Sequence, residues 1–297
     1  MRILVTGGSG FIGRNLVAYL RQTHDVMAPT RAELDVADPD AVDGWFSEHT
    51  VDAVVHGALR PGHRNAGDTS NQLWTNLRMW SGIMRNAHRF GRLIFLSSGA
   101  VYDISKPHER VTEDRLGESV PADEHGLSKY VIAQYFDASH RAGLVDVVEL
   151  RLFGVFGKHE DYAIRFVSNA ICKTLFDLPI SLRQNRTFSY LYVDDLGPIV
   201  DTFLTADHAH AAYNVVPDRT DDLHDLALRV RARSGKDLPI VVGAPGNGLP
   251  YSGANSRLRE EIPDVTFTPT DMAIGALYDW YVTNLSAIDR SALTSDK

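Results

Sequence analysis

The chain opens with a short apolar segment that leads directly into a glycine-rich turn and then into a helical pattern. Residues 2–6 (RILVT) read as a strand, and from residue 15 onward the apolar side chains recur at helical spacing. Between them stand three glycines spaced three residues apart, Gly7, Gly10 and Gly13. A tight turn from a buried strand into a helix is typical of α/β folds, so this segment predicts a sheet with helices packed on it.

The same alternation of strand and helix continues to about residue 152. Apolar runs predict further strands at residues 26–28, 51–56, 93–96 and 145–152. Helical patterns lie at residues 39–48, 76–88 and 126–142, the first with Asp38 as its N-cap. This order predicts a doubly wound parallel Rossmann sheet, which binds ligands in the loops at the carboxyl ends of its strands.

The pattern becomes looser in the second half of the chain. Helices are predicted at residues 164–176, 195–205, 223–234 and 270–285, and prolines and glycines are frequent at residues 239–250. We therefore expect a dinucleotide-binding domain over residues 1–157 and a smaller, mixed α/β substrate-binding lobe over residues 158–297. Some segments of the lobe are expected to return to the first domain.

Composition excludes several classes of protein. With 30 basic and 38 acidic side chains the net charge is −8, which argues against nucleic-acid or anionic-membrane partners. The single cysteine, Cys172, allows neither an internal disulfide nor a multi-cysteine metal site, and the loosely spaced histidines and aspartates at residues 207–225 predict no metal. No apolar run approaches the roughly 18 residues of a membrane helix. We expect a soluble, cytoplasmic protein.

The glycine turn predicts a site for a dinucleotide. Its glycines allow a tight turn, close approach to a pyrophosphate and packing of helix on sheet. The helix N-terminus supplies N–H donors and positive dipole potential to the phosphates. The residues expected to do this are Gly7, Gly10, Phe11, Ile12 and Gly13.

The end of the second strand bears on which dinucleotide is bound. An acidic residue there holds the ribose 2′-hydroxyl of NAD, but residues 27–31 read MAPTR and contain no carboxylate. Arg31 is placed to meet a 2′-phosphate, which favours NADP(H) over NAD(H); the alternative is a solvated surface arginine. Asp35 and Val36 are expected to border the adenine.

Several motifs in order resemble the extended short-chain dehydrogenase/reductase family of nucleotide-sugar epimerases, dehydratases and reductases. They are GGSGFIG at residues 7–13, SSGAVY at 97–102, GLSK at 126–129, RLFGVFG at 151–157 and YVDDL at 192–196. TRAELD at 30–35 and SRL at 256–258 look most like the GDP-fucose synthase type of 4-ketoreductase. The resemblance implies a nucleotide-sugar substrate and a homodimer that pairs the helices near residues 76–88 and 126–142.

The resemblance also implies roles for individual residues. Ser98 matches the family's serine, which binds the reacting oxygen, and Lys129 matches the lysine that holds the nicotinamide ribose. Further assignments to the cofactor are Gly57, Ala58, Leu59 and Phe153, and assignments to the substrate are Tyr102 and Arg186.

The position of the family's catalytic tyrosine, four residues before Lys129, is His125. Tyr130 and Tyr135 are out of phase with it on a helix. One interpretation is that an imidazole, with an ordinary pKa near 6.5, takes over the acid–base work. The other is that hydride transfer is lost and the cofactor serves structure or signalling.

A second departure concerns the substrate. Phe188 stands where the family has an arginine that contacts the substrate pyrophosphate, and Arg186 or Arg183 is the candidate replacement. We expect an NADP(H)-dependent reductase of a 4-keto nucleotide sugar. The alternatives are a nucleotide-sugar 4-epimerase and a dinucleotide-binding sensor or partner protein without turnover.

Overall fold

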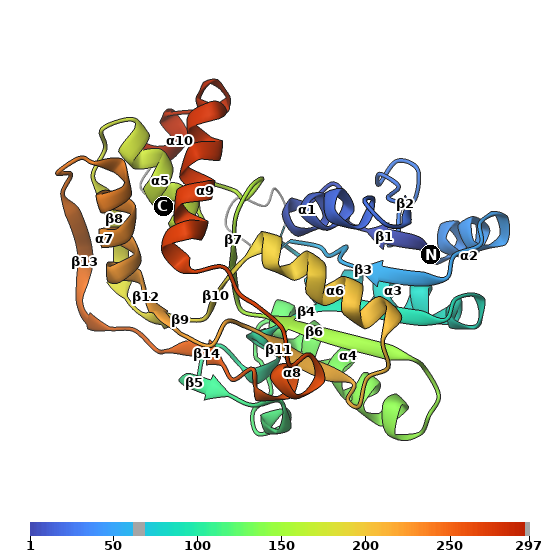
Figure 1. Ribbon diagram of the computed structural model, residues 1–297. Helices are drawn as coiled ribbons and strands as arrows, with labels where there is room; N and C mark the ends of the chain where they lie inside the picture. Colours follow the sequence, from blue (N-terminus) through green and yellow to red (C-terminus); the bar gives the residue numbers. More distant parts are fainter. Residues whose placement is uncertain (62–68, 295–297) are drawn as a thin grey trace.

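The computed structural model describes residues 1–61 and 69–294, and its larger part is built on the parallel sheet that the sequence predicts. The sheet has six strands in the order β11-β6-β4-β3-β1-β2 (Figure 1). They are β1 (Arg2–Thr6), β2 (Asp25–Met27), β3 (Ala53–His56), β4 (Arg92–Ser98), β6 (Val147–Leu152) and β11 (Ala212–Val215). Because β11 comes from the second half of the chain, a distant segment completes the sheet.

Helices cover both faces of this sheet, which confirms the doubly wound fold. One face carries α1 (Phe11–Leu20) and α6 (Leu196–Thr205). The other carries α2 (Pro39–Glu48), α3 (Gln72–Arg85) and α4 (Glu124–Arg141). Burial on both faces is why the strands read as continuous apolar runs rather than alternating ones. Asp38 caps α2 as expected, with its Oδ1 accepting from the backbone N–H of Asp40 at 3.0 Å.

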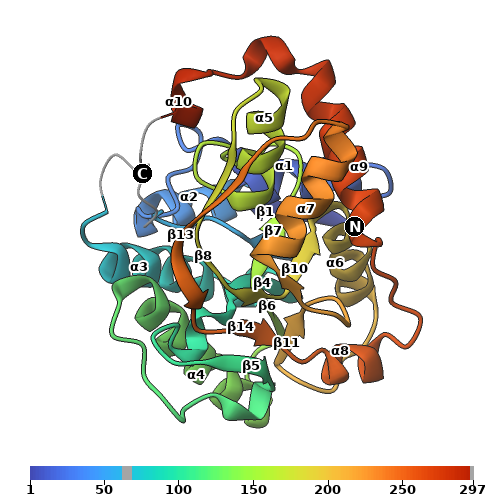
Figure 2. The same ribbon diagram turned by 90° about the vertical axis from the view of Figure 1, so that its left-hand side faces the viewer.

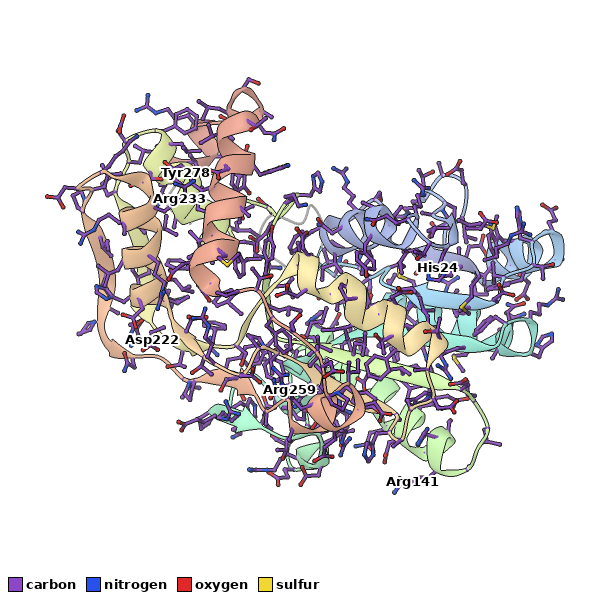
Figure 3. All side chains as sticks on the ribbon, in the orientation of Figure 1. His24, Arg141, Asp222, Arg233, Arg259 and Tyr278 are labelled. Atoms are coloured by element: carbon purple, nitrogen blue, oxygen red, sulfur yellow. The ribbon has the colours of Figure 1, made fainter. Side chains whose placement is uncertain are left out.

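The smaller lobe has a separate apolar core, shared by α5 (Phe166–Leu175), α7 (Leu223–Ser234) and α9 (Thr270–Thr283). Figure 2 views the molecule from the side of this lobe, where the paired strands β8 (Ile180–Asn185) and β13 (Ile240–Asn247) lie alongside the helices. Arg233 of α7 lies 5.4 Å from the ring of Tyr278 in α9, and Figure 3 labels both. The predicted helices of the second half are therefore present.

Short strands connect the two parts, and the sequence did not predict them. β7 (Gly154–Phe156) pairs with β10 (Tyr190–Tyr192). The other four, β5 (His108–Val111), β9 (Thr187–Phe188), β12 (Asp221–Asp222) and β14 (Tyr251–Gly253), form one sheet. The remaining helices are α8 (Ser256–Glu261) and α10 (Ser291–Thr294). Strands of two to four residues are too short to show a period in the sequence. Nowhere in the described chain is a helix both long and apolar enough to cross a membrane.

Candidate active site

A cavity of about 790 Å³ opens at the carboxyl edge of the sheet. Its walls come from the loops that follow β1, β2, β3, β4 and β6, from the start of α4 and from the stretch before α5. Fifteen of the residues that the sequence proposes for the site line it: Gly7, Gly10, Phe11, Ile12, Gly13, Arg31, Asp35, Val36, Gly57, Ala58, Leu59, Ser98, His125, Lys129 and Phe153. The fold thus brings together residues that are up to 146 positions apart in the chain.

The glycine turn is shaped by close backbone approach. Gly7 has a φ of +72°, and a Cβ on it would lie 2.7 Å from the backbone N of Ala58. A Cβ on Gly13 would lie 2.1 Å from the carbonyl oxygen of Gly7. Gly10 stands at the N-cap of α1 without a side chain that could satisfy the first amides, and the first turn contains no acidic residue. These N–H groups, with the helix dipole behind them, fit an anionic diphosphate.

Arg31 and Asp35 form a charged pair at the cavity wall after β2. Nε and Nη2 of Arg31 lie 3.2 and 3.1 Å from Oδ2 of Asp35, and the arginine side chain is 78% exposed. Glu33 is turned toward Thr30, whose N–H and hydroxyl donate to its Oε2 at 2.7 and 2.9 Å. The guanidinium therefore stands at the rim with one carboxylate partner and a large exposed surface.

Ser98, His125 and Lys129 line the same cavity. Ser98 ends β4, and its Oγ accepts from the backbone N–H of Ala100 at 3.2 Å. His125 and Lys129 lie one turn apart at the start of α4, the same helix face. Asp123 fixes that helix start, because its Oδ1 accepts from the N–H of Gly126 at 2.8 Å.

The surroundings of Lys129 hold its ammonium in one place. The side chain is buried, Nζ donates to the carbonyl oxygen of Leu96 at 3.0 Å, and it lies 4.4 Å from the ring centroid of Phe95. Burial lowers the pKa of Lys129 to about 8, and the charge of Glu149 opposes that shift. A hydrogen-bonded, partly desolvated ammonium is suited to bind ribose hydroxyls that enter the cavity.

The pKa of His125 is lowered from its ordinary value. Burial is the largest cause, the positive charges of Lys129 and Arg165 add to it, and only Asp123 acts in the opposite direction. The imidazole of the ligand-free protein is therefore mainly neutral near neutral pH, ready to accept a proton and able to donate one only from its minor protonated form.

Tyr102 and Arg186, which the sequence assigned to the substrate, are not among the residues that line the cavity. The hydroxyl of Tyr102 donates to Oδ1 of Asn214 at 2.8 Å and accepts from Arg151 at 2.7 Å. Arg151 is also paired with the buried carboxylate of Glu149 at 2.9 Å. Tyr102 thus belongs to a buried polar network and not to the cavity lining.

Arg186 follows β8 and packs on aromatic rings. Its guanidinium lies 4.8 Å from the ring of Phe188 and 5.8 Å from that of Tyr251, and its Nε donates to the carbonyl oxygen of Leu249. Phe188 also lies outside the cavity lining. The prediction that Arg186 contacts the substrate in place of the family's arginine at position 188 is therefore not supported by the cavity lining.

One wall of the cavity contains none of the residues assigned above to cofactor, substrate or catalysis, although the position of residues 159–161 after Gly157 left open that they touch the substrate. It is the stretch between β7 and α5, and its lining residues are Glu160, Asp161, Ile164 and Arg165. Glu160 is buried, its Oε2 accepts from the hydroxyl of Ser168 at 2.5 Å, and burial raises its pKa to about 8. The available signal was position alone, since this stretch follows the strand-end loop after residue 152. Within the residues described, no three His, Cys, Asp or Glu side chains group as metal ligands would.

Comparisons with known proteins agree with this architecture. The sequence profile described as NAD dependent epimerase/dehydratase family matches residues 3–216. A GDP-L-fucose synthase of Azorhizobium caulinodans is 30% identical over 164 residues, which are 52% of this chain and 53% of that protein, so the match spans about half of each.

Two solved structures share the fold. A GDP-L-fucose synthetase from Naegleria fowleri bound to NADP superposes with a TM-score of 0.81 at 15% identity, over 96% of this chain and 95% of that one. A UDP-glucose 4-epimerase of Thermus thermophilus in complex with NAD gives a TM-score of 0.77 at 22% identity, over 95% and 99% of the two chains. At such identities the likeness is one of fold.

Proposed function

The chain belongs to the NAD dependent epimerase/dehydratase family, and we propose that within it the protein is an NADP(H)-dependent reductase of a nucleotide-linked 4-keto sugar. One observation carries the proposal. The glycine turn lines the same cavity as Ser98, His125 and Lys129, so a dinucleotide held by the turn would reach the three polar side chains. The UDP-glucose 4-epimerase described above shares the fold, and 4-epimerisation is the second candidate function.

Each polar side chain has a separate task in this proposal. NADPH bound in the cavity would supply the hydride for the keto carbon. Lys129 binds the nicotinamide ribose, Ser98 donates a hydrogen bond to the carbonyl oxygen, and His125 transfers a proton to that oxygen as it becomes a hydroxyl. The carbonyl gains one hydride and one proton, and the imidazole regains its proton from water.

Arg165 connects substrate binding to this proton transfer. It lines the cavity, and its charge is one cause of the lowered pKa of His125. A substrate diphosphate paired with Arg165 would offset that charge and so raise the pKa of His125 in the complex. We therefore assign the substrate diphosphate to Arg165, the role that the sequence gave to Arg186.

The test is a turnover assay with NADPH and 4-keto sugars carrying GDP, UDP or dTDP. Loss of NADPH absorbance together with a product bearing a new hydroxyl supports the proposal. NADPH that binds without being oxidised by any of these compounds would leave the non-catalytic alternative. The same assay with NADH measures the preference for NADP(H), which the cavity-lining Arg31 supports.

The neutral state of His125 favours a second candidate, the 4-epimerase. A neutral imidazole is suited to take the proton from a sugar hydroxyl, which is the first step of that reaction. An epimerase would interconvert UDP-glucose and its C4 epimer with catalytic amounts of cofactor and without net oxidation of NADPH. Substrate conversion under those conditions would replace the reductase proposal.

We further propose a homodimer through α3 and α4. Three large apolar side chains of these helices are exposed, Trp74 by 64% and Val131 and Tyr135 by 40% each. Pairing the helices of two copies would bury them. Trp74→Lys should convert a dimer into a monomer in sedimentation experiments, whereas a wild-type protein that sediments as a monomer contradicts this assembly.

A further inference from the structure

Two buried polar atoms on neighbouring strands have no hydrogen-bond partner within the described residues, namely Oγ of Ser97 and Oε1 of Glu149. Ser97 lies in β4 and is 5% exposed, and Glu149 lies in β6 and is 0% exposed. A buried polar atom without a partner is costly, and ordered water is a common partner where no protein group is available. Whether one ligand can serve both atoms depends on the side of the sheet that each side chain faces.

The strand register places both side chains on the face that α4 covers. Phe95 of β4 is the register partner of Glu149, and Ser97 is the register partner of Arg151. Register partners project to the same side of a sheet, and so do residues two positions apart in one strand. Phe95 belongs to the same apolar cluster as Ile132 of α4. Ser97 and Glu149 therefore both point into the layer between the sheet and this helix.

The salt bridge of Glu149 directs its carboxylate toward Ser97. Nε and Nη2 of Arg151 both donate to Oε2 of Glu149, at 3.1 and 2.9 Å. Because Arg151 stands opposite Ser97 in the sheet, this contact draws the carboxylate along its strand toward the serine. Oε2 is engaged by the guanidinium, and Oε1 remains as an acceptor.

Lys129 brings a third polar group to the same place. Its Nζ donates to the carbonyl oxygen of Leu96 at 3.0 Å and lies 4.4 Å from the ring centroid of Phe95. Leu96 stands between Phe95 and Ser97 in β4, so the ammonium lies beside the strand segment that carries the serine hydroxyl. An ammonium has three protons, and Leu96 accepts one of them, which leaves two for other acceptors.

We propose that one water molecule binds between Ser97, Glu149 and Lys129 and connects the ammonium to a buried counter-ion. The water accepts from Nζ of Lys129 and from the hydroxyl of Ser97, and it donates to Oε1 of Glu149. Three polar partners are the usual number for a buried water. Ser97 and Lys129 line the cavity, so water reaches the site from there.

The charged groups around Lys129 explain what this bridge does. His56, at the end of β3, is neutral because burial lowers its pKa to about 3, and the pKa of His125 on α4 is lowered as well. Arg151 is always positive. Of these groups only Glu149 carries a negative charge, and it faces two cations. If that charge is removed, Lys129 can respond by losing its proton and Arg151 cannot.

The role of the bridge in cofactor binding rests on the proposed function, in which a charged Lys129 binds the nicotinamide ribose. The water site itself does not depend on the reaction. Glu149 is a positioning residue in this scheme, because it acts through Lys129 and does not line the cavity.

A high-resolution crystal structure of the wild-type protein tests the site directly. We expect a density peak within hydrogen-bond distance of Ser97 Oγ, Glu149 Oε1 and Lys129 Nζ. The peak should be lost in Ser97→Val, which replaces the hydroxyl by methyl groups, and kept in Ser139→Ala, which changes a buried serine of α4 outside the cavity lining. No peak in the wild type, or direct contact between Nζ and Oε1, would overturn the water site.

The titration of Lys129 tests the counter-ion. In NMR spectra of protein with isotope-labelled lysine, the resonance missing from Lys129→Arg identifies Lys129. Its titration midpoint in Glu149→Gln should fall by at least about one pH unit, because the ammonium loses its negative neighbour. Tyr102→Phe removes a different partner of Arg151 and should keep the wild-type midpoint. An unchanged midpoint in Glu149→Gln would overturn the role of Glu149.

Ser97→Val decides the question if Glu149→Gln does not fold. This variant keeps both charges and displaces the water, so the midpoint of Lys129 should again fall, and an unchanged midpoint would refute the bridge. If the wild type neither binds NADPH nor reduces a keto sugar, the proposed function fails, whereas the density and the lysine titration still decide the water site. An active reductase without the density peak would keep the proposed function and lose the bridge.

Discussion

Two walls of the cavity are built in different ways. The cofactor wall consists of residues 7–13, 31–36 and 57–59, which are loops that each follow a strand of the parallel sheet. The lobe wall consists of Glu160, Asp161, Ile164 and Arg165, a single stretch that leads from β7 into α5. The sheet fixes the position of the first wall, and the packing of the smaller lobe fixes the second.

The walls also differ in chemistry. The cofactor wall offers backbone amides, glycines and a helix dipole, with one charged pair at its rim. The lobe wall presents ionisable side chains, one of which, Glu160, is buried. Backbone groups bind a constant element such as a dinucleotide diphosphate, whereas side chains can vary without disturbing the sheet. We infer that the lobe wall determines which substrate is bound.

The largest expected effect is on the cofactor wall. Gly13→Ala should weaken NADPH binding at least about 100-fold, or about 2.7 kcal/mol, because the added Cβ would lie 2.1 Å from the carbonyl oxygen of Gly7 and displace the turn. Gly44→Ala in α2 is the matched control, since its Cβ meets no atom within 4 Å. Isothermal titration with NADPH measures both. Wild-type affinity in the Gly13 variant would show that the turn does not hold the dinucleotide.

The next effect concerns His125, which lines the cavity and whose pKa is affected by Arg165 of the lobe wall. His125→Phe should lower kcat for keto-sugar reduction about 100-fold with an unchanged Kd for NADPH, and His125→Tyr should retain more activity. Because the pKa of His125 is lowered, its protonated fraction grows as the pH falls, so reduction by the wild type should accelerate toward acidic pH. The Tyr variant should lose this acidic dependence. Unchanged turnover in His125→Phe would show that His125 does not transfer the proton.

The comparison explains what the sequence could reveal. Buried strands such as β3 read as continuous apolar runs, and helices such as α2 carry an apolar period and an N-cap. The fold rule then places the loops after the strands at one edge. Local patterns therefore pointed to the glycine turn and to the loop after the second strand, and both line the cavity. Residues 57–59, Ser98 and Lys129 were assigned through the family resemblance, and they line it as well.

The remaining residues depend on contacts between distant segments. Tyr102 lies in a recognisable motif, but its hydroxyl is engaged by Arg151 and Asn214, and no local pattern records such a network. Arg186 packs on Tyr251, which lies in a three-residue strand within a stretch rich in glycine and proline, where periodicity predicts nothing. Arg165 lines the cavity and lies close enough to His125 to affect its pKa, a consequence of tertiary packing that no local pattern records.

A smaller effect concerns stability and the lobe wall. The pKa of the Glu160 carboxyl is raised to about 8, so the folded state keeps a proton that the unfolded chain releases above its ordinary pKa near 4.5. The contribution of Glu160 to the free energy of unfolding should therefore be fully present below about pH 4.5. It should decrease as the pH rises toward 8, by about 1.4 kcal/mol per pH unit. Urea unfolding across this range should show a weaker decrease for Glu160→Gln, and the exposed Glu48→Gln should match the wild type. If the stability of Glu160→Gln fell with pH as steeply as that of the wild type, a group other than Glu160 would cause the pH dependence.

The smallest effect concerns Arg31, the side chain of the cofactor wall that we propose discriminates NADPH from NADH. Arg31→Ala should weaken NADPH binding about ten-fold and leave NADH binding unchanged, because a guanidinium contributes a charge-assisted hydrogen bond only to the 2′-phosphate. Asp35→Asn should act in the opposite direction, since it removes the carboxylate that holds Arg31 and repels phosphate. Arg21→Ala, an exposed arginine outside the cavity, controls for net charge. Equal losses for NADPH and NADH in Arg31→Ala would make Arg31 a general surface charge, and discrimination between the two cofactors would then have to arise from the backbone of the wall itself.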